Sequence, residues 1–329
     1  MKCRRGRRRS ERGYSPFSQA RLTVASMSKI ELIAEGLEFP EGPVVMPDGS
    51  VILVEIKRGT LTRCWKGRSE VIAEIGGGPN GAAFGPDGAI YVCNNGGFAW
   101  HDAGGLTIPG NAAADYETGR IERVDLATGK AERVYESVGE HKLRGPNDIV
   151  FDKSGAFWFT DLGKGWPRQR DRGGLYYAKI DGSLIKEAAY GHVGLNGVGL
   201  SPDETVIYCA ETETGKLWAF DIAGEGEVAP GALGGSGRVV AVQPAHVYFD
   251  SLAVQANGDV CVATILNGGV TTITPAGAST HTPFPDPIVT NICFGGADMR
   301  DAYVTFSGTG KLAKVRWPAP GLKLNFNPY

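Results

Sequence analysis

The chain has 329 residues, of which 42% are hydrophobic and 21% charged, a balance typical of a soluble globular protein with enough chain for a large core. Its 48 glycines and 19 prolines follow no collagen period and indicate a turn-rich, all-β protein. No apolar run approaches the roughly 18 residues of a membrane span, so we expect no membrane contact.

The net charge of −2 conceals a basic N-terminal segment. Residues 1–26 hold eight basic side chains and one acidic one, whereas the rest of the chain holds 26 basic and 35 acidic ones. Such a run is either an arm for nucleic acid or another anionic surface, or a disordered leader. We predict a leader over residues 1–27, with Met27 as an alternative start, and no nucleic-acid partner. The segment lacks the apolar stretch of a secretory signal.

The six cysteines lack the CxxC spacing of metal and redox sites. Four of them lie inside apolar, β-like runs: Cys93, Cys209, Cys261 and Cys293. Cysteines in such positions are typical of reduced core thiols, so we predict a cytoplasmic protein without a cysteine metal site.

Six segments of the chain repeat one pattern: a polar residue, a short apolar run, a turn rich in Asp, Gly or Asn, and a second apolar run. They begin at Glu41, Asn80, Asn147, Asn196, Asp250 and Asn291. Each segment predicts a β-hairpin, and several are followed by a further strand pair, as in residues 119–136 and 269–278. Four short strands about every 40–55 residues predict a six-bladed β-propeller with four-stranded antiparallel blades over residues 28–329.

The leading residues of the six segments are all carboxylates or carboxamides. Turn capping explains some of them but not Glu41, because Glu is a poor turn former. The first strand of each propeller blade lines the central channel, so we expect all six to converge on the axis. Oxygen donors without Cys or a positioned His suit a hard divalent cation. Glu41 and Asp250 would neutralise it, whereas without a metal they would repel each other and one would be protonated.

The residue that ends the second strand of each hairpin is expected to face the same mouth, one strand further from the axis. These second-ring residues are Glu55, Asn94, Asp161, Glu211, Thr264 and Ser307. Asp161 and Glu211 are candidates for orienting ligands or transferring protons, and solvated strand ends are the alternative.

The longest interval between repeats contains a Gly-rich, aromatic loop over residues 94–116. Long loops in compact domains are frequently functional. We therefore interpret this loop as a rim or lid of the site, with a solvated insertion as the alternative.

Five stretches resemble the senescence marker protein–gluconolactonase (regucalcin-like) family. They are FPEGPVV (39–45), RGPNDIVFD (144–152), LNGVGLSPD (195–203), YFDSLAV (248–254) and TNICFGG (290–296). The resemblance covers roughly residues 30–325 and excludes the basic leader. It implies a six-bladed propeller with one divalent metal ion on its axis, in a family that includes sugar lactonases and a relative that hydrolyses phosphotriesters.

The resemblance also implies roles for single residues. The implied metal ligands are Glu41, Asn147, Asn196 and Asp250. The implied substrate contacts are Asn147 and Arg144. The leading residue Asn80 and the second-ring carboxylates Asp161 and Glu211 are further candidates for substrate contact. Arg144 stands where sugar lactonases have an arginine that contacts sugar hydroxyls, although its spacing to Asn147 differs. Ser251 stands where the family commonly has Gly, a change expected to alter the shape of the pocket but not ligation.

We therefore predict a metal-dependent hydrolase that opens the ring of a small-molecule lactone. The ion, with Ca²⁺ expected and Zn, Mn, Mg or Fe(II) as alternatives, would polarise the carbonyl. Asp250 is the expected general base, with Asp161 or Glu211 as second choice, and the amide of Asn147 would stabilise the oxyanion. The alternatives are an aryl lactone or phosphotriester substrate, and a non-catalytic calcium-binding propeller. We expect a monomer or a weak homo-oligomer.

Overall fold

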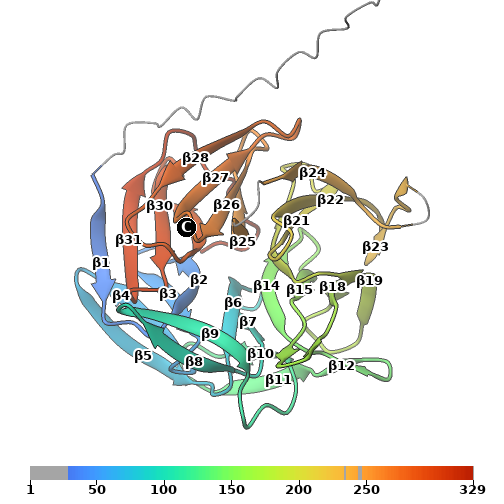
Figure 1. Cartoon of the computed structure of the whole chain (residues 1–329), viewed down its shortest axis with the longest axis horizontal. Coiled ribbons are helices and arrows are strands. Elements are labelled where there is room, and N and C mark those ends of the chain that lie inside the picture. Colours follow the sequence, from blue (N-terminus) through green and yellow to red (C-terminus); the bar gives the residue numbers. More distant parts are fainter. Residues whose placement is uncertain (1–28, 233–234, 244–246, 329) are drawn as a thin grey trace, which may run out of the picture.

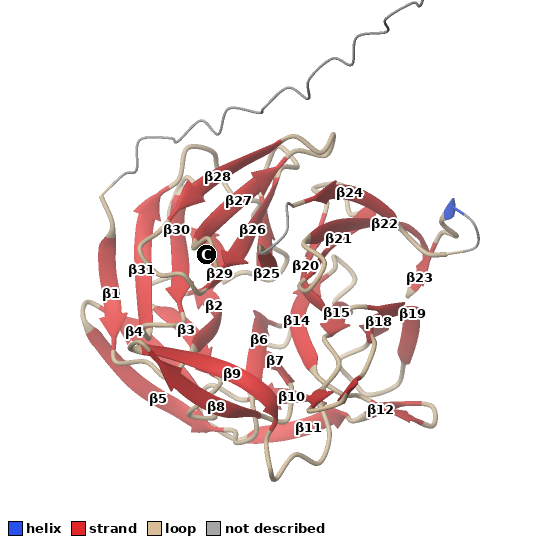
Figure 2. Cartoon of the chain, in the orientation of Figure 1, coloured by secondary structure: helices blue, strands red, loops and turns tan. Residues whose placement is uncertain are grey.

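The strands of the protein form a ring of six antiparallel sheets around a central axis (Figures 1 and 2). The computed structural model describes residues 29–232, 235–243 and 247–328. The predicted six-bladed propeller is confirmed, whereas the leader predicted over residues 1–27 lies outside the described residues and the domain boundaries stay a prediction. Over the same described ranges, a search for a helix that could span a membrane finds none.

The first three blades are formed by residues 40–192. Blade 1 contains β2 (Pro40–Val45), β3 (Val51–Glu55), β4 (Thr60–Trp65) and β5 (Arg68–Glu74). Blade 2 contains β6 (Pro79–Phe84), β7 (Ile90–Asn94), β10 (Arg120–Val124) and β11 (Ala131–Tyr135). Blade 3 contains β14 (Pro146–Phe151), β15 (Phe157–Asp161), β18 (Gly173–Ala178) and β19 (Ile185–His192).

The remaining blades complete the ring. Blade 4 contains β20 (Leu195–Leu200), β21 (Val206–Glu211), β22 (Lys216–Gly224) and β24 (Arg238–Val242), and β23 (Glu227–Val228) also pairs with β22. Blade 5 contains β25 (Tyr248–Val254), β26 (Val260–Ile265), β27 (Gly269–Ile273) and β28 (Ser279–Pro283). Blade 6 contains β29 (Val289–Gly295), β30 (Asp301–Phe306), β31 (Lys311–Arg316) and β1 (Glu31–Glu35).

Three short hairpins extend from the blades. They are β8 (Phe98–Ala103) with β9 (Leu106–Ala112), β12 (Ser137–Val138) with β13 (His141–Lys142), and β16 (Gly165–Trp166) with β17 (Gln169–Arg170). The first of them occupies most of the aromatic loop predicted over residues 94–116, and the role of this loop as a rim or lid stays a prediction.

The ring closes by pairing the two ends of the described chain. β1 pairs antiparallel with β31, and Glu31 lies opposite Lys314. The outermost strand of blade 6 therefore comes from residues that precede the first repeat. The first strand of every blade contacts the first strands of both neighbouring blades, which encloses the axial channel.

The apolar cores lie between neighbouring blades. Tyr91 of blade 2 packs against Phe151 and Phe157 of blade 3, with ring centroids 5.3 and 5.9 Å apart. Because each blade is covered on both faces, a second strand such as β3 is buried at every position. This double burial explains why the second strands read as continuous apolar runs rather than as alternating patterns.

A β-bulge interrupts each inner strand beside its leading polar residue. The irregularities follow Glu41, Pro79, Pro146, Leu195, Phe249 and Val289. Bulges re-aim side chains and are common next to functional sites. Glycine after the leading residue lets neighbouring inner strands approach closely, because a Cβ on Gly81 would lie 2.4 Å from the carbonyl oxygen of Asn147.

Candidate active site

The six leading residues lie at the beginnings of the inner strands, around one end of the axial channel. They are Glu41 on β2, Asn80 on β6, Asn147 on β14, Asn196 on β20, Asp250 on β25 and Asn291 on β29. All are buried, with 1–5% of their surface exposed, except Asp250, which is half-buried. The structure thus brings the predicted residues to one place, and Asp250 is the member of the set most open to solvent.

Glu41 is the buried carboxylate on which the site is built. Its Oε2 accepts hydrogen bonds from Asn291 Nδ2 and from the backbone N–H of Gly42, both at 2.7 Å. Its Oε1 is buried without a hydrogen-bond partner. Burial raises the pKa of Glu41 to about 7, and the bond from Asn291 only partly opposes this. An unpartnered carboxylate oxygen in a buried site is a position where a cation would be favourable.

Asp250 and Asn196 form the neighbouring part of the site. Burial raises the pKa of Asp250 well above its usual range, and the negative charge of Glu41 raises it further. The side chain of Asn196 is held in place on both sides: its Nδ2 donates to Thr212 Oγ1 at 3.1 Å, and its Oδ1 accepts from Ser251 Oγ at 3.4 Å. The serine found in place of the family's glycine therefore contacts a predicted ligand directly.

The available donors determine which ion the site would suit. Asn147 Oδ1, like Glu41 Oε1, is buried without a partner. Over the described part of the chain, no group of three or more His, Cys, Asp or Glu side chains is arranged to hold a metal ion. An axial cation would consequently need amide oxygens as well as carboxylates, and an all-oxygen set of this kind fits Ca²⁺ or another hard cation.

Asp148 is a site residue that the sequence reasoning missed, although it stands next to Asn147. It is buried, and its Oδ1 and Oδ2 accept from the backbone N–H groups of Ile149 (2.9 Å) and Val198 (3.4 Å). Burial, followed by the charge of Glu41, raises the pKa of Asp148 to about 7. The signal was available, because three sister repeats have glycine at the position where blade 3 has this aspartate.

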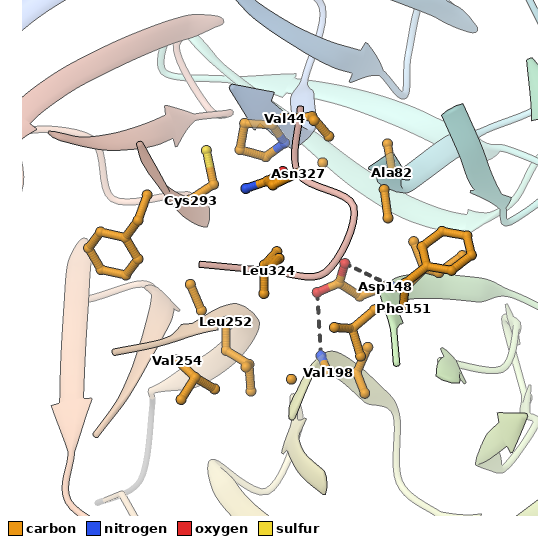
Figure 3. A pocket seen from close by; sticks show the side chains of 18 of the residues that line it. Val44, Ala82, Asp148, Phe151, Val198, Leu252, Val254, Cys293, Leu324 and Asn327 are labelled. Carbon is orange, nitrogen blue, oxygen red and sulfur yellow. Dashed lines mark hydrogen bonds between the residues drawn. The ribbon is translucent and has the colours of Figure 1, made fainter. Parts of the chain in front are cut away.

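Asp148 borders a cavity of about 90 Å³ further along the channel. Figure 3 shows its carboxylate beside apolar side chains of the inner strands and beside the C-terminal segment that crosses the channel. Among the lining residues are Val44, Ala82, Val198, Leu252 and Leu324. The polar site and this apolar cavity thus share one channel, with Asp148 where they meet.

The second-ring residues are buried at the ends of the second strands and bind backbone groups. Asp161 accepts hydrogen bonds at 2.7 Å from the N–H groups of Arg144, Gly145 and Gly163, and Glu211 accepts from Val193 N at 3.0 Å. Glu55 and Asn94 likewise accept from Glu38 N and Gly78 N, whereas Thr264 and Ser307 donate to the carbonyl oxygens of Gly269 and Pro40. Four of the six therefore hold the loop that precedes the leading residue of their own blade. A direct substrate contact by Asp161 or Glu211 stays a prediction.

Arg144 lies on the rim of the mouth, with 47% of its side chain exposed. Its Nε is 3.6 Å from Asp171 Oδ2, and its carbonyl oxygen accepts a hydrogen bond at 2.7 Å from the hydroxyl of Tyr116, which ends the aromatic loop. A direct substrate contact by Arg144 also stays a prediction.

Comparisons with known proteins identify the family of the chain. The family model for the SMP-30/gluconolactonase/LRE-like region matches residues 39–308. A gluconolactonase from Zymomonas mobilis subsp. mobilis is 27% identical over 238 residues, which are 65% of this chain and 60% of that relative's length.

Two solved structures have the same fold. A gluconolactonase from Xanthomonas campestris matches with a TM-score of 0.69 at 21% identity, covering 88% of this chain and 90% of that one. Regucalcin from Agrobacterium tumefaciens, a calcium-binding protein, matches with a TM-score of 0.68 at 19% identity, covering 92% and 100%. The fold and the family match over most of the chain therefore lead to one conclusion: this chain belongs to the SMP-30/gluconolactonase/LRE-like family.

Proposed function

We propose that the protein is a metal-dependent hydrolase that opens the ring of a small lactone, with gluconolactone-like sugar lactones as substrates. The observation that carries this proposal is the buried set of oxygen ligands in which Glu41 Oε1 and Asn147 Oδ1 have no partner. Membership of the family and the activity named for the Zymomonas relative support the choice of lactone hydrolysis.

The residues that would hold the ion are Glu41, Asn147, Asn196 and Asp250. A divalent cation bound there would act as a Lewis acid toward the lactone carbonyl. We propose Ca²⁺, because carboxylate and amide oxygens are its usual ligands and because a calcium-binding protein has the same fold. The positive charge would also favour the ionised forms of the axial carboxylates, which burial alone disfavours.

Asp250 is the proposed general base. It is less buried than the other five axial residues. It would remove a proton from the attacking water as that water adds to the carbonyl carbon, and would return the proton to the ring oxygen as the ring C–O bond breaks. The Nδ2 of Asn147 would donate a hydrogen bond to the carbonyl oxygen as negative charge develops there. Asp161 and Glu211 would act by holding the loops that carry Asn147 and Asn196.

Lactone hydrolysis in a pH-stat, with EDTA and then with added Ca²⁺, tests the proposal. The wild-type protein is expected to open at least one sugar lactone, to lose this activity in EDTA and to regain it with Ca²⁺. Asp250→Asn should lower kcat about 10²- to 10⁴-fold, the usual contribution of a general base. Asp259→Asn is the matched control, because Asp259 lies at the turn between β25 and β26, the end of blade 5 away from the site.

The alternatives give different results in the same assay. Tight Ca²⁺ binding with no turnover of any lactone would identify a non-catalytic calcium-binding propeller. Turnover of only aryl lactones or phosphotriesters would keep the site and change the substrate. Full activity of Asp250→Asn would exclude Asp250 as the base.

A further inference from the structure

The hairpin β8–β9 stands along one side of the mouth. In Figure 1 it crosses blade 1 beside the centre of the ring and leaves the centre uncovered. The ring of Trp100 on β8 lies 5.1 Å from that of Phe39, which precedes Glu41 by two residues. The backbone N–H of Thr107 on β9 donates to the carbonyl oxygen of Gly308 at 3.0 Å, which connects the hairpin to blade 6.

The apolar face of the hairpin rests on the loops that lead into the site. Phe39, Ile56 and Ile288 form a buried cluster, and the partly buried residues packed against it are Phe98, Trp100, Leu106, Ile108 and Ile265. Ile288 precedes Asn291 by three residues, as Phe39 precedes Glu41 by two. The position of the hairpin is thus coupled by packing to two of the six axial residues.

Lys164, from the loop after β15 in blade 3, reaches the base of this hairpin. Its side chain is fully buried. Its Nζ donates to Asn95 Oδ1 at 3.0 Å and to the carbonyl oxygen of Gly97 at 2.7 Å, and it lies 3.8 Å from the centre of the Phe98 ring. All these partners belong to residues 95–98, the segment that connects β7 to β8. A buried lysine is rare, so these contacts must offset a large desolvation penalty.

The number of partners matches the chemistry of the amine. Burial lowers the pKa of Lys164 to about 7; Asp161 opposes this shift and Arg170 adds to it. A neutral amine has two N–H groups, which the two acceptors satisfy, and the face of the Phe98 ring is available to the third N–H of the charged form. The same contacts therefore serve the lysine in both protonation states.

The segment that Lys164 binds is a tight turn whose N–H groups at Gly96 and Gly97 donate to the side chains of Asn94 and Asn95. Asn95 Oδ1 also accepts from Gly97 N at 2.8 Å, and Asn95 N donates to Gly78 O at 2.8 Å. Removal of the amine would leave the oxygen of Gly97 with only the long bond from Ala113 N at 3.3 Å, and would weaken the turn from which the hairpin begins.

We infer that Lys164 is a positioning residue that holds the β8–β9 hairpin in place as a wall of the substrate mouth, and that this wall decides which lactone substituents bind. The first half stands on the contacts of Lys164 alone. The second half rests on the proposed lactonase function. The hairpin and Lys164 come from different blades, so the contacts of Lys164 with the hairpin cross the interface between blades 2 and 3.

Hydrogen exchange and lactone kinetics on Lys164→Met test the two halves separately. Amides of residues 98–112 should exchange about tenfold or more faster than in the wild type, whereas those of β14 should be unchanged, because only the hairpin loosens. KM for a sugar lactone should rise about fivefold or more with kcat within about twofold, the pattern of lost substrate binding. A residue that only stabilised the fold would lower the melting temperature and leave KM unchanged.

Two further variants keep the test decisive. Lys57→Met is the control. In the wild type, Lys57 Nζ lies 3.7 Å from Asp102 Oδ1 of the hairpin, but 76% of the Asp102 side chain is exposed. The ion pair is therefore weak, and amide exchange should not change. If Lys164→Met fails to fold, Phe98→Leu removes the ring and should loosen the same amides. Unchanged exchange in the folded variants would show that Lys164 does not hold the hairpin in place. Faster exchange with an unchanged KM would show that the hairpin does not contribute to substrate binding. A wild type without lactonase activity would refute the proposed function, but the exchange result would still decide whether Lys164 holds the hairpin in place.

Discussion

The two ends of the axial channel are lined by the same six strands and have opposite chemistry. At one end, carboxylates and amides are buried with unpartnered oxygens on Glu41 and Asn147. At the other end, apolar side chains surround a cavity of about 90 Å³, and the C-terminal segment crosses it (Figure 3). That segment is held by the blades, since Leu322 N donates to Val254 O at 2.9 Å and Asn325 Nδ2 donates to Phe151 O at 3.1 Å.

The two ends of the channel differ in what occupies them. The C-terminal segment fills most of the apolar end, where a cavity of about 90 Å³ remains. The polar end contains three carboxylates with raised pKa values, Glu41, Asp148 and Asp250, and no basic side chain in the described part of the chain lowers those pKa values. The polar end is therefore where we propose that a cation binds, and substitutions at the two ends should have separable effects.

Glu41→Gln should have the largest effect, a loss of cation binding and of activity at the polar end. The change keeps the shape of the side chain but removes a charge that the proposed cation needs. We expect kcat/KM for a sugar lactone to fall about 10³-fold or more, equivalent to roughly 4 kcal/mol of transition-state stabilisation. Steady-state kinetics and Ca²⁺ titration calorimetry measure this. Unchanged Ca²⁺ affinity would contradict the assignment.

The second-largest expected effect is a pH dependence of stability that arises only at the polar end of the channel. Burial raises the pKa of Glu41 and of Asp148 to about 7, so between pH 5 and 7 the folded state binds more protons than the unfolded state. Stability of the cation-free protein should consequently fall as the pH rises through this range, by up to about 1.4 kcal/mol per pH unit for each group. Urea unfolding in EDTA at pH 5 and 8 measures the fall, and Ca²⁺ at pH 8 should reverse it. A midpoint that does not change with pH would argue against buried axial carboxylates.

Phe294→Ala should destabilise the apolar end and spare the polar one. Phe294 is buried, and a Cβ on Gly321 of the C-terminal segment would lie 2.1 Å from its ring. We expect a loss of about 3 kcal/mol in unfolding free energy, the usual effect of removing a buried ring. Urea unfolding measures the loss, and Ca²⁺ affinity of the folded variant should stay within about twofold. A large loss of Ca²⁺ affinity would mean that the two ends are coupled.

Ser251→Gly should have the smallest effect and measures how much the Ser251 hydroxyl supports Asn196 at the polar end. It removes the hydroxyl that donates to Asn196 Oδ1 at 3.4 Å. A bond of this length contributes less than about 1 kcal/mol, so Ca²⁺ affinity should change by less than about fivefold. Calorimetry on the variant measures this, and a larger change would make Ser251 an essential support of the ligand.

The sequence predicted the repeats well because the signals are local. The apolar runs and turn chemistry that define the hairpins lie within about 15 residues, and every predicted leading residue lies on an inner strand. Asp148 was missed because its importance depends on the closeness of Glu41, more than 100 residues away in the chain. The contacts of Asp161 with backbone amides were missed for a similar reason, since the hairpin pattern does not show where the preceding loop runs.

By itself, the sequence determined the number of blades, the strands that line the axis and the oxygen donors they present, because these follow from periodicity and residue type. Only the tertiary structure decided that β1 completes blade 6, that the C-terminal segment fills the apolar end of the channel and that Lys164 reaches the hairpin of blade 2. Each of these depends on contacts between segments far apart in the chain, where packing and the need to partner buried polar groups select one arrangement.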